Sequence, residues 1–207
     1  MKIDFKSNFL AVFAVFFLGG CAIENIKNLE PKTMKGEAKY THICDNKSAN
    51  ESNDIGVKFE LEYDFESAKI CYKIACEHDL GVACSNLGSL YQKNGDKQNE
   101  ADILGLFIKA CKLNSRYGCY NGANSYRLAV GVEHDFVKAI KLYEKACIEL
   151  NHAKSCTNLG GMHQFSLGVE VGGRDVARKY YKMGCELGDE VGCKNLSLIG
   201  EREIKTK

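Results

Sequence analysis

The sequence predicts an all-α protein in which four helix-turn-helix repeats stack into an α-solenoid. Three observations lead to this fold class: a pair of cysteines recurs four times, an aromatic residue precedes the first cysteine by four positions, and an asparagine follows the second by two. A single helix hairpin cannot cover its own apolar stripe, so such units must stack on their neighbours. The recurring pairs are Cys76 with Cys84, Cys111 with Cys119, Cys147 with Cys156, and Cys185 with Cys193.

Each predicted repeat consists of two helices joined by a short polar turn. The first helix ends at the first cysteine, and residues four positions apart on it share one face. The second carries small residues that allow close approach, and the units end near Gly95, Gly131 and Gly168, because glycine suits helix ends. We expect a solenoid over residues 61–203, with repeats at about 62–97, 98–133, 134–171 and 172–203, and a C-terminal tail at 204–207. The aromatic residues before the first cysteines are Tyr72, Phe107, Tyr143 and Tyr181.

The first twenty residues are typical of an export signal. Lys2 and Lys6 precede an apolar run from Phe9 to Leu18, which is too short to span a bilayer and predicts a signal peptide over residues 1–20. The small residues before Cys21 resemble the lipobox of bacterial lipoproteins, and this resemblance implies acylation of Cys21. An ordinary secretory signal with an incidental Cys21 is the alternative. Both interpretations place the chain in a compartment that permits disulfides.

Residues 21–60 are expected to form a lipid anchor, a tether and an N-terminal cap. The polar segment from Ala22 to about Lys39 has no apolar period and predicts a tether. The polar stretch 45–54 predicts a loop, and a short element lies before it, around Tyr40 to Cys44. Removal of residues 1–20 leaves equal numbers of basic and acidic residues. This balance argues against a nucleic-acid partner and leaves membrane attachment to the lipid alone.

The repeat motif resembles a known family. The Ala-Cys ending of the first helix, the Cys-x-Asn-Leu-Gly start of the second and the closing glycine resemble the Sel-one-like repeat (SLR) branch of the tetratricopeptide (TPR) superfamily, over about residues 61–200. The match is closer still to the cysteine-rich secreted SLR proteins of bacteria, in which each repeat carries a disulfide. This resemblance implies the bridges Cys76–Cys84, Cys111–Cys119, Cys147–Cys156 and Cys185–Cys193.

The alternative for these cysteines is a metal site, but structural zinc sites favour two to four residues between paired cysteines and here there are seven or eight. No metal is therefore expected. Two further cysteines, Cys44 and Cys71, remain once Cys21 is set aside. Cys71 points about 140° away from Cys76 on the same helix. We therefore predict a fifth bridge, Cys44–Cys71, that clamps the N-terminal element onto the first repeat; free thiols are the alternative.

No catalytic residues emerge from a search for enzyme motifs. Ser-x-x-Lys, Ser-Asp-Asn, Lys-Thr-Gly, Gly-x-Ser-x-Gly and His-Glu-x-x-His are absent from the sequence. The resembled family has been described as penicillin-binding or weakly hydrolysing β-lactams, so the resemblance keeps a β-lactam-binding protein with weak β-lactamase activity as an alternative function. No cofactor is expected. The scattered histidines, interpreted as lone turn or surface residues, are His42, His78, His134, His152 and His163.

A repeated asparagine is the polar feature most suited to a binding site. A ladder of carboxamides on one wall of a groove could pair with the amides of an extended peptide. The alternative is that each asparagine bonds its own backbone or the neighbouring repeat. We expect an exported, lipid-anchored scaffold that binds a peptide, a protein or a cell-wall component, at a periplasmic membrane face (by preference the outer membrane) or secreted. The four candidate binding residues are Asn86, Asn121, Asn158 and Asn195.

Overall fold

The computed structural model describes residues 42–95, 100–170 and 172–204, and these residues form helices joined by turns. The predicted all-α solenoid is confirmed. The predicted signal peptide, Cys21, the tether and residues 205–207 lie outside the described residues. After a helical turn at residues 42–45, the elements are α2 (Ala49–Leu61), α3 (Phe65–Glu77), α4 (Gly81–Asn94), α5 (Glu100–Lys112), α6 (Arg116–Leu128), α7 (Phe136–Glu144), the π-helical turn η1 (Lys145–Glu149), α8 (Ala153–Gln164), α9 (Arg174–Glu186) and α10 (Glu190–Ile204).

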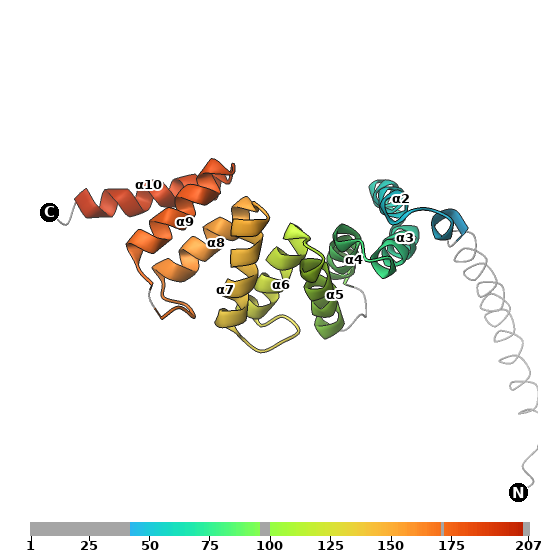
Figure 1. Ribbon diagram of the computed structural model, residues 1–207, viewed down its shortest axis with the longest axis horizontal. Helices are drawn as coiled ribbons and strands as arrows, with labels where there is room; N and C mark the ends of the chain where they lie inside the picture. The colour runs from blue at the N-terminus through green and yellow to red at the C-terminus, as the bar shows by residue number, and fades with distance from the viewer. Residues whose placement is uncertain (1–41, 96–99, 171, 205–207) are drawn as a thin grey trace, which may run out of the picture.

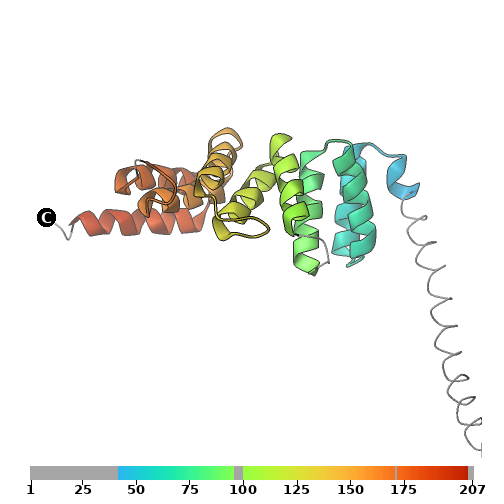
Figure 2. The same cartoon turned by 90° about the horizontal axis from the view of Figure 1, so that it is seen from below.

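The helices stack one after another along the long axis of the molecule, from α2 at one end to α10 at the other (Figures 1 and 2). The stack bends, so that α2 and α10 both lie to the same side of the middle helices α5 to α7 (Figure 1). Besides the contacts between consecutive helices, α4 touches α6 and α8 touches α10. Contacts that skip one helix arise where a curved stack is tightest, so the even-numbered helices form its inner side.

At two contacts between units, an aromatic ring packs directly against a helical glycine. A Cβ atom added to Gly88 would lie 2.7 Å from the ring of Phe107, and one added to Gly160 would lie 2.6 Å from the ring of Tyr181. Both rings are almost fully buried. Only glycine permits this approach at these two positions, because helix and ring are in contact without any intervening side chain. The repeated aromatic residues therefore serve the stacking between units.

The predicted loop at residues 45–54 is wrong from Ala49 onward, where α2 begins. Ser48 and Glu51 form a capping box: the Ser48 hydroxyl accepts from the Glu51 amide at 3.3 Å, and the Ser48 amide donates to the Glu51 carboxylate at 2.9 Å. Composition alone suggested a loop because the segment is polar. Its buried residues instead make tertiary contacts: Ser52 bonds the Cys44 carbonyl oxygen, and Asn53 accepts from Asn86 of α4. These contacts stabilise a helix that would not form in isolation.

Residues 42–61 form the end of an additional, incomplete unit. Ser52 follows Cys44 by eight residues, which is the separation within three of the four repeat disulfides. The Ser52 hydroxyl donates to the Cys44 carbonyl oxygen at 2.9 Å. Four residues further on, Gly56 meets the ring of Tyr72, just as the glycines of the later units meet their aromatic rings. The N-terminal cap is therefore half of a repeat, without its own cysteine pair.

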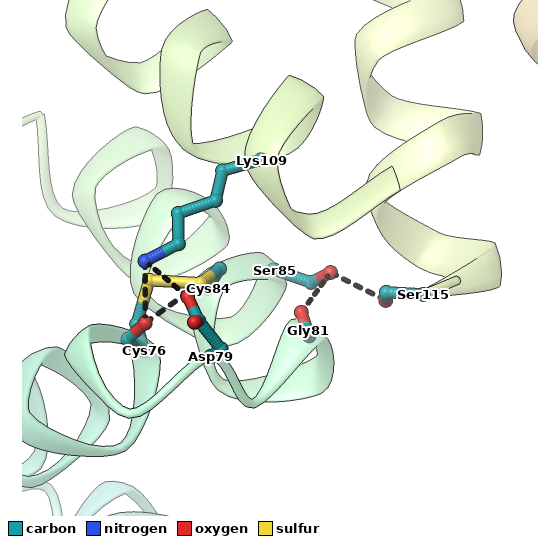
Figure 3. The surroundings of a disulfide bond; sticks show 7 residues. All are labelled: Cys76, Asp79, Gly81, Cys84, Ser85, Lys109 and Ser115. Atoms are coloured by element: carbon teal, nitrogen blue, oxygen red, sulfur yellow. Dashed lines mark hydrogen bonds and ion pairs between the residues drawn. A yellow bond between two sulfur atoms is a disulfide. The ribbon is translucent and has the colours of Figure 1, made fainter. Parts of the chain in front are cut away.

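Five disulfides join Cys44 to Cys71, Cys76 to Cys84, Cys111 to Cys119, Cys147 to Cys156 and Cys185 to Cys193. Figure 3 shows the surroundings of the second of these. Lys109, from the following unit, donates to the Cys76 carbonyl oxygen at 2.8 Å and pairs with Asp79 at 3.0 Å. On the other side of the turn, the hydroxyls of Ser85 and Ser115 are 2.7 Å apart and buried. The Cys76–Cys84 turn is thus tied to the unit that follows it.

The third repeat accommodates an extra residue between its cysteines as a local change of helix type. Cys147 and Cys156 are nine residues apart, whereas the other repeat pairs are eight apart. The additional residue is absorbed by the π-helical turn η1, in which the Leu150 amide bonds the Lys145 carbonyl oxygen at 3.2 Å. A π-bulge is the usual way in which a helix absorbs one inserted residue. The Cα atoms of the bridge consequently remain 4.8 Å apart.

Candidate functional site

The even-numbered helices present a regular surface, which we call the inner face. Residues two before and two after each second cysteine are four positions apart, so they share one side of the helix. The earlier row is exposed and mostly apolar, whereas the later row holds the four asparagines, each half-buried. The inner face therefore carries a row of amides beside a row of exposed side chains. Its defining residues are Val82, Asn86, Tyr117, Asn121, Lys154, Asn158, Val191 and Asn195.

Three of the four asparagines contact the neighbouring unit through their amide nitrogens. Asn86 Nδ2 donates to Asn53 Oδ1 on α2 at 3.0 Å, and Asn121 Nδ2 donates to Ser89 Oγ on α4 at 3.3 Å. These bonds fix the orientation of the carboxamides across the stack. The stacking role considered for the asparagines is therefore present in the structure, alongside any role in binding.

The same bonds leave one group of each carboxamide available. The Oδ1 atoms of Asn86, Asn121 and Asn158 accept no hydrogen bond from the part of the chain that the structure describes. None of the three is buried, so all remain accessible to solvent. With the amide nitrogens bonded to the protein, the carbonyl oxygens are left as acceptors on the inner face. Such a row of acceptors is complementary to the backbone N–H groups of an extended chain.

Asn158 belongs to a network centred on the buried hydroxyl of Tyr143. Tyr143 Oη accepts from Asn158 Nδ2 at 3.1 Å and from Arg127 Nε at 3.1 Å, and it donates to Asn124 Oδ1. Burial raises the pKa of the Tyr143 hydroxyl, which keeps it protonated. One side chain of α7 thus holds residues of α6 and α8 at fixed positions. Sequence reasoning identified Tyr143 only as a packing residue.

The inner face deepens into a pocket of about 270 Å³ between α6, α8, α9 and α10. Asn158 and Asn195 both line it, so the structure brings two of the four predicted asparagines to one cavity. Arg127 lines the pocket, and the exposed side chains of Phe165 and Val191 form apolar parts of its wall. Sequence reasoning missed Arg127 and Phe165. Phe165 lies seven residues, about two helical turns, after Asn158, and this register is the signal that could have found it, whereas no comparable sequence signal marks Arg127.

The five histidines lie at separate places in the chain, and in the described residues none belongs to a group of three or more potential metal ligands. His42, His78 and His134 are exposed and far apart in the sequence. His152, predicted as a turn or surface residue, lies in the turn before α8 but is buried, where burial lowers its pKa to about 4 and the charges of Arg116 and Lys154 act in the same direction. Its Nδ1 lies 2.8 Å from Ser155 Oγ. Within the ranges 42–95, 100–170 and 172–204, no three His, Cys, Asp or Glu side chains gather as metal ligands.

The fold and the inner face define a helical repeat protein with a groove suited to binding. A model of the Sel1 repeat matches residues 56–80, 81–115, 116–148 and 153–189, which together make up more than half of the chain. The chain therefore belongs to the Sel1 repeat family, as the sequence motifs predicted. The matched units are offset by one helix from the hairpins described above: the first begins within α2 and the others at or near the starts of α4, α6 and α8. The disulfides that follow α3, α5 and η1 therefore each link two consecutive matched units.

Solved structures of Sel1 repeat proteins resemble the chain. The cysteine-rich protein HcpB of Helicobacter pylori is 33% identical with a TM-score of 0.53, over 64% of this chain and 95% of HcpB. The protective antigen c5321 of uropathogenic Escherichia coli is 28% identical with a TM-score of 0.65, over 72% of this chain and 32% of c5321. A Sel1 repeat protein from Oxalobacter formigenes is 24% identical, with a TM-score of 0.65 over 70% of this chain and 60% of that protein, and it supports the fold alone.

Among curated proteins, cytochrome c oxidase assembly factor 7 of Xenopus tropicalis is 32% identical over 81 residues, which is 38% of this chain and 35% of that protein. The chain spans about a third of the length of the assembly factor and of c5321. No helix in the described part of the chain is long and apolar enough to cross a membrane. The five disulfides and the likeness to HcpB indicate an extracytoplasmic protein.

Proposed function

We propose that this chain is an exported, lipid-anchored scaffold whose inner face binds an extended peptide segment of a partner protein. The row of outward carbonyl oxygens, held by Asn86, Asn121 and Asn158, is the observation that carries the proposal. An extended peptide offers backbone N–H groups along its length, and the exposed row of Val82, Tyr117 and Val191 offers apolar contacts for its side chains. A peptide from the cell wall would meet the same chemistry.

The binding experiment uses the purified, oxidised protein and a pool of acetylated, amidated heptapeptides with randomised sequence. We expect the protein to retain peptides from this pool, and Asn121→Ala to weaken their binding about fivefold, because one hydrogen bond contributes about 1 kcal/mol. The control is Ser89→Ala. This change removes the bond between Asn121 and its neighbour but keeps the carboxamide. Equal losses in both variants would mean that Asn121 serves stacking and not binding.

Export and anchoring rest on the sequence of residues 1–21, in which a basic start and an apolar run precede Cys21. The proposed mature chain begins at an acylated Cys21, continues as a tether and enters the solenoid near residue 61, through the half-repeat. An intact mass of the protein isolated from its native membrane tests this. The proposal predicts the loss of residues 1–20 and the mass of acyl chains; a full-length, unmodified chain would contradict it.

A further inference from the structure

Arg127 is held in place by a contact that does not need its charge. Its Nε donates to the hydroxyl of Tyr143, which is fully buried and is also held by Asn158. In the following unit, Gln164 stands at the same position, eight residues after the second cysteine, and bonds the hydroxyl of Tyr181 at 2.7 Å. A neutral side chain therefore suffices to hold the repeated tyrosine. The positive charge of Arg127 is not required by the stacking.

The charge of Arg127 is also unmatched within the protein. Arg127 forms no ion pair with any residue in the described ranges, and its Nε is the guanidinium atom that bonds another side chain. Since the Nε edge is occupied, the other edge, with both terminal amino groups, remains for a ligand. Two parallel N–H groups on that edge match the two oxygens of a carboxylate.

The pocket around Arg127 favours a single negative charge. Of the side chains that line it in the described part of the chain, Arg127 alone is charged, and its neighbours include Met162, Phe165 and Val191. Apolar side chains beside the guanidinium reduce the water around it and strengthen a charge-assisted bond. One cation balances one carboxylate, whereas a doubly charged phosphate would retain one negative charge without a cationic partner among the lining residues of the described chain.

We propose that Arg127 is the specificity residue of the inner face and that it selects peptides carrying a carboxylate. This inference rests on the proposed peptide-binding function. The carboxylate comes from an Asp or Glu side chain or from the peptide's C-terminus, and an adjacent apolar side chain packs against Phe165 and Val191. Asn158 and Asn195 line the same pocket and bond the backbone on either side of the carboxylate.

The test compares three heptapeptide pools with six positions randomised among neutral residues. The first has Asp at its centre and an amidated end, the second has Asn at its centre and an amidated end, and the third has Asn at its centre and a free C-terminal carboxylate. We expect the oxidised protein to retain the first or the third pool at least fivefold more than the second. The preferred pool tells whether a side-chain or a terminal carboxylate is bound.

The decisive variant is Arg127→Gln, which places in this unit the residue that Gln164 already provides in the next. We expect the preference for carboxylate peptides to fall to nearly one while the neutral pool still binds. Lys141→Gln, which removes an exposed positive charge from α7, should leave the preference unchanged and serves as the control for net charge. Urea midpoints of both variants check that the fold is retained.

Each result separates the inference from the proposed function. Retention of none of the three pools would overturn the peptide-binding function and the inference with it. Equal retention of all three pools by the unmodified protein would leave peptide binding in place and overturn the role of Arg127. A carboxylate preference that persists in Arg127→Gln would assign recognition to another residue and would also overturn the inference.

Discussion

Replacing Tyr143 by Phe tests whether one hydroxyl holds the pocket together. The substitution keeps the ring, which is fully buried, and removes the oxygen that bonds Arg127, Asn158 and Asn124. Phe107 occupies the same place in the preceding unit, so a phenyl ring fits this position of the repeat. The cost should therefore come from the hydrogen bonds and not from packing.

The expected loss of stability follows from the number and kind of bonds. Two neutral bonds contribute about 1 kcal/mol each, and the bond from the Arg127 guanidinium contributes somewhat more, but the half-buried partners regain part of this from water. We expect Tyr143→Phe to lower the free energy of unfolding by about 2–3 kcal/mol. The matched variant is Tyr181→Phe, which loses one neutral bond to Gln164 and should cost about 1 kcal/mol.

Urea denaturation of the oxidised proteins, followed by far-UV circular dichroism, measures both losses. The free energies of unfolding should be compared only between proteins with the same slope of free energy against urea concentration. A different slope would indicate partial unfolding of the repeat array. A cost for Tyr143→Phe no larger than that for Tyr181→Phe would refute the argument that the Tyr143 hydroxyl organises the pocket.

Three further perturbations test other parts of the structure. The folded-state pKa of His152 is lowered to about 4, so its contribution to stability is complete above about pH 6.5. As the pH falls from 6.5 to 4, the free energy of unfolding should decrease by about 3 kcal/mol. His152→Asn should remove this part of the pH dependence measured by urea titration. Replacing Cys44 and Cys71 together by Ala opens a loop with a sequence separation of 27 and should cost about 3.5 kcal/mol in the same assay; an unchanged midpoint would mean that the bridge does not constrain the unfolded chain. Gly88→Ala should destabilise by about 1–2 kcal/mol through its clash with a buried ring, whereas Gly105→Ala, with open space around it, should stabilise by up to about 1 kcal/mol; thermal melts that move in the same direction would contradict the packing.

The helical hairpins could be predicted because their signals are local and repeated. The spacing from Tyr72 to Cys76 and its counterparts records one helix face, and four copies distinguish a solenoid from a chance pattern. Helix α2 could not be found by composition, since its polar residues Ser52 and Asn53 become buried only through contacts with Cys44 and with Asn86 of α4. The capping-box sequence from Ser48 to Glu51 was a local signal for it.

The candidate site could be predicted only in part. The register of Asn158 and Asn195 placed them on one side of the second helices of successive repeats, and the structure adds that both line one pocket. The roles of Arg127 and Tyr143 depend on contacts between residues of three helices, which sequence spacing alone does not reveal. The π-helical turn in the third repeat was visible beforehand only as one additional residue between Cys147 and Cys156.

The claim that the inner face is the binding surface is tested most directly by nuclear magnetic resonance of the oxidised, isotopically labelled protein. The measurement follows backbone amide shifts during titration with a peptide retained from the heptapeptide pool. We predict that the shifts concentrate on α6, α8 and α10, around Asn158 and Asn195, and that they diminish in Arg127→Gln. Shifts confined to the odd-numbered helices α5, α7 and α9 would contradict the account.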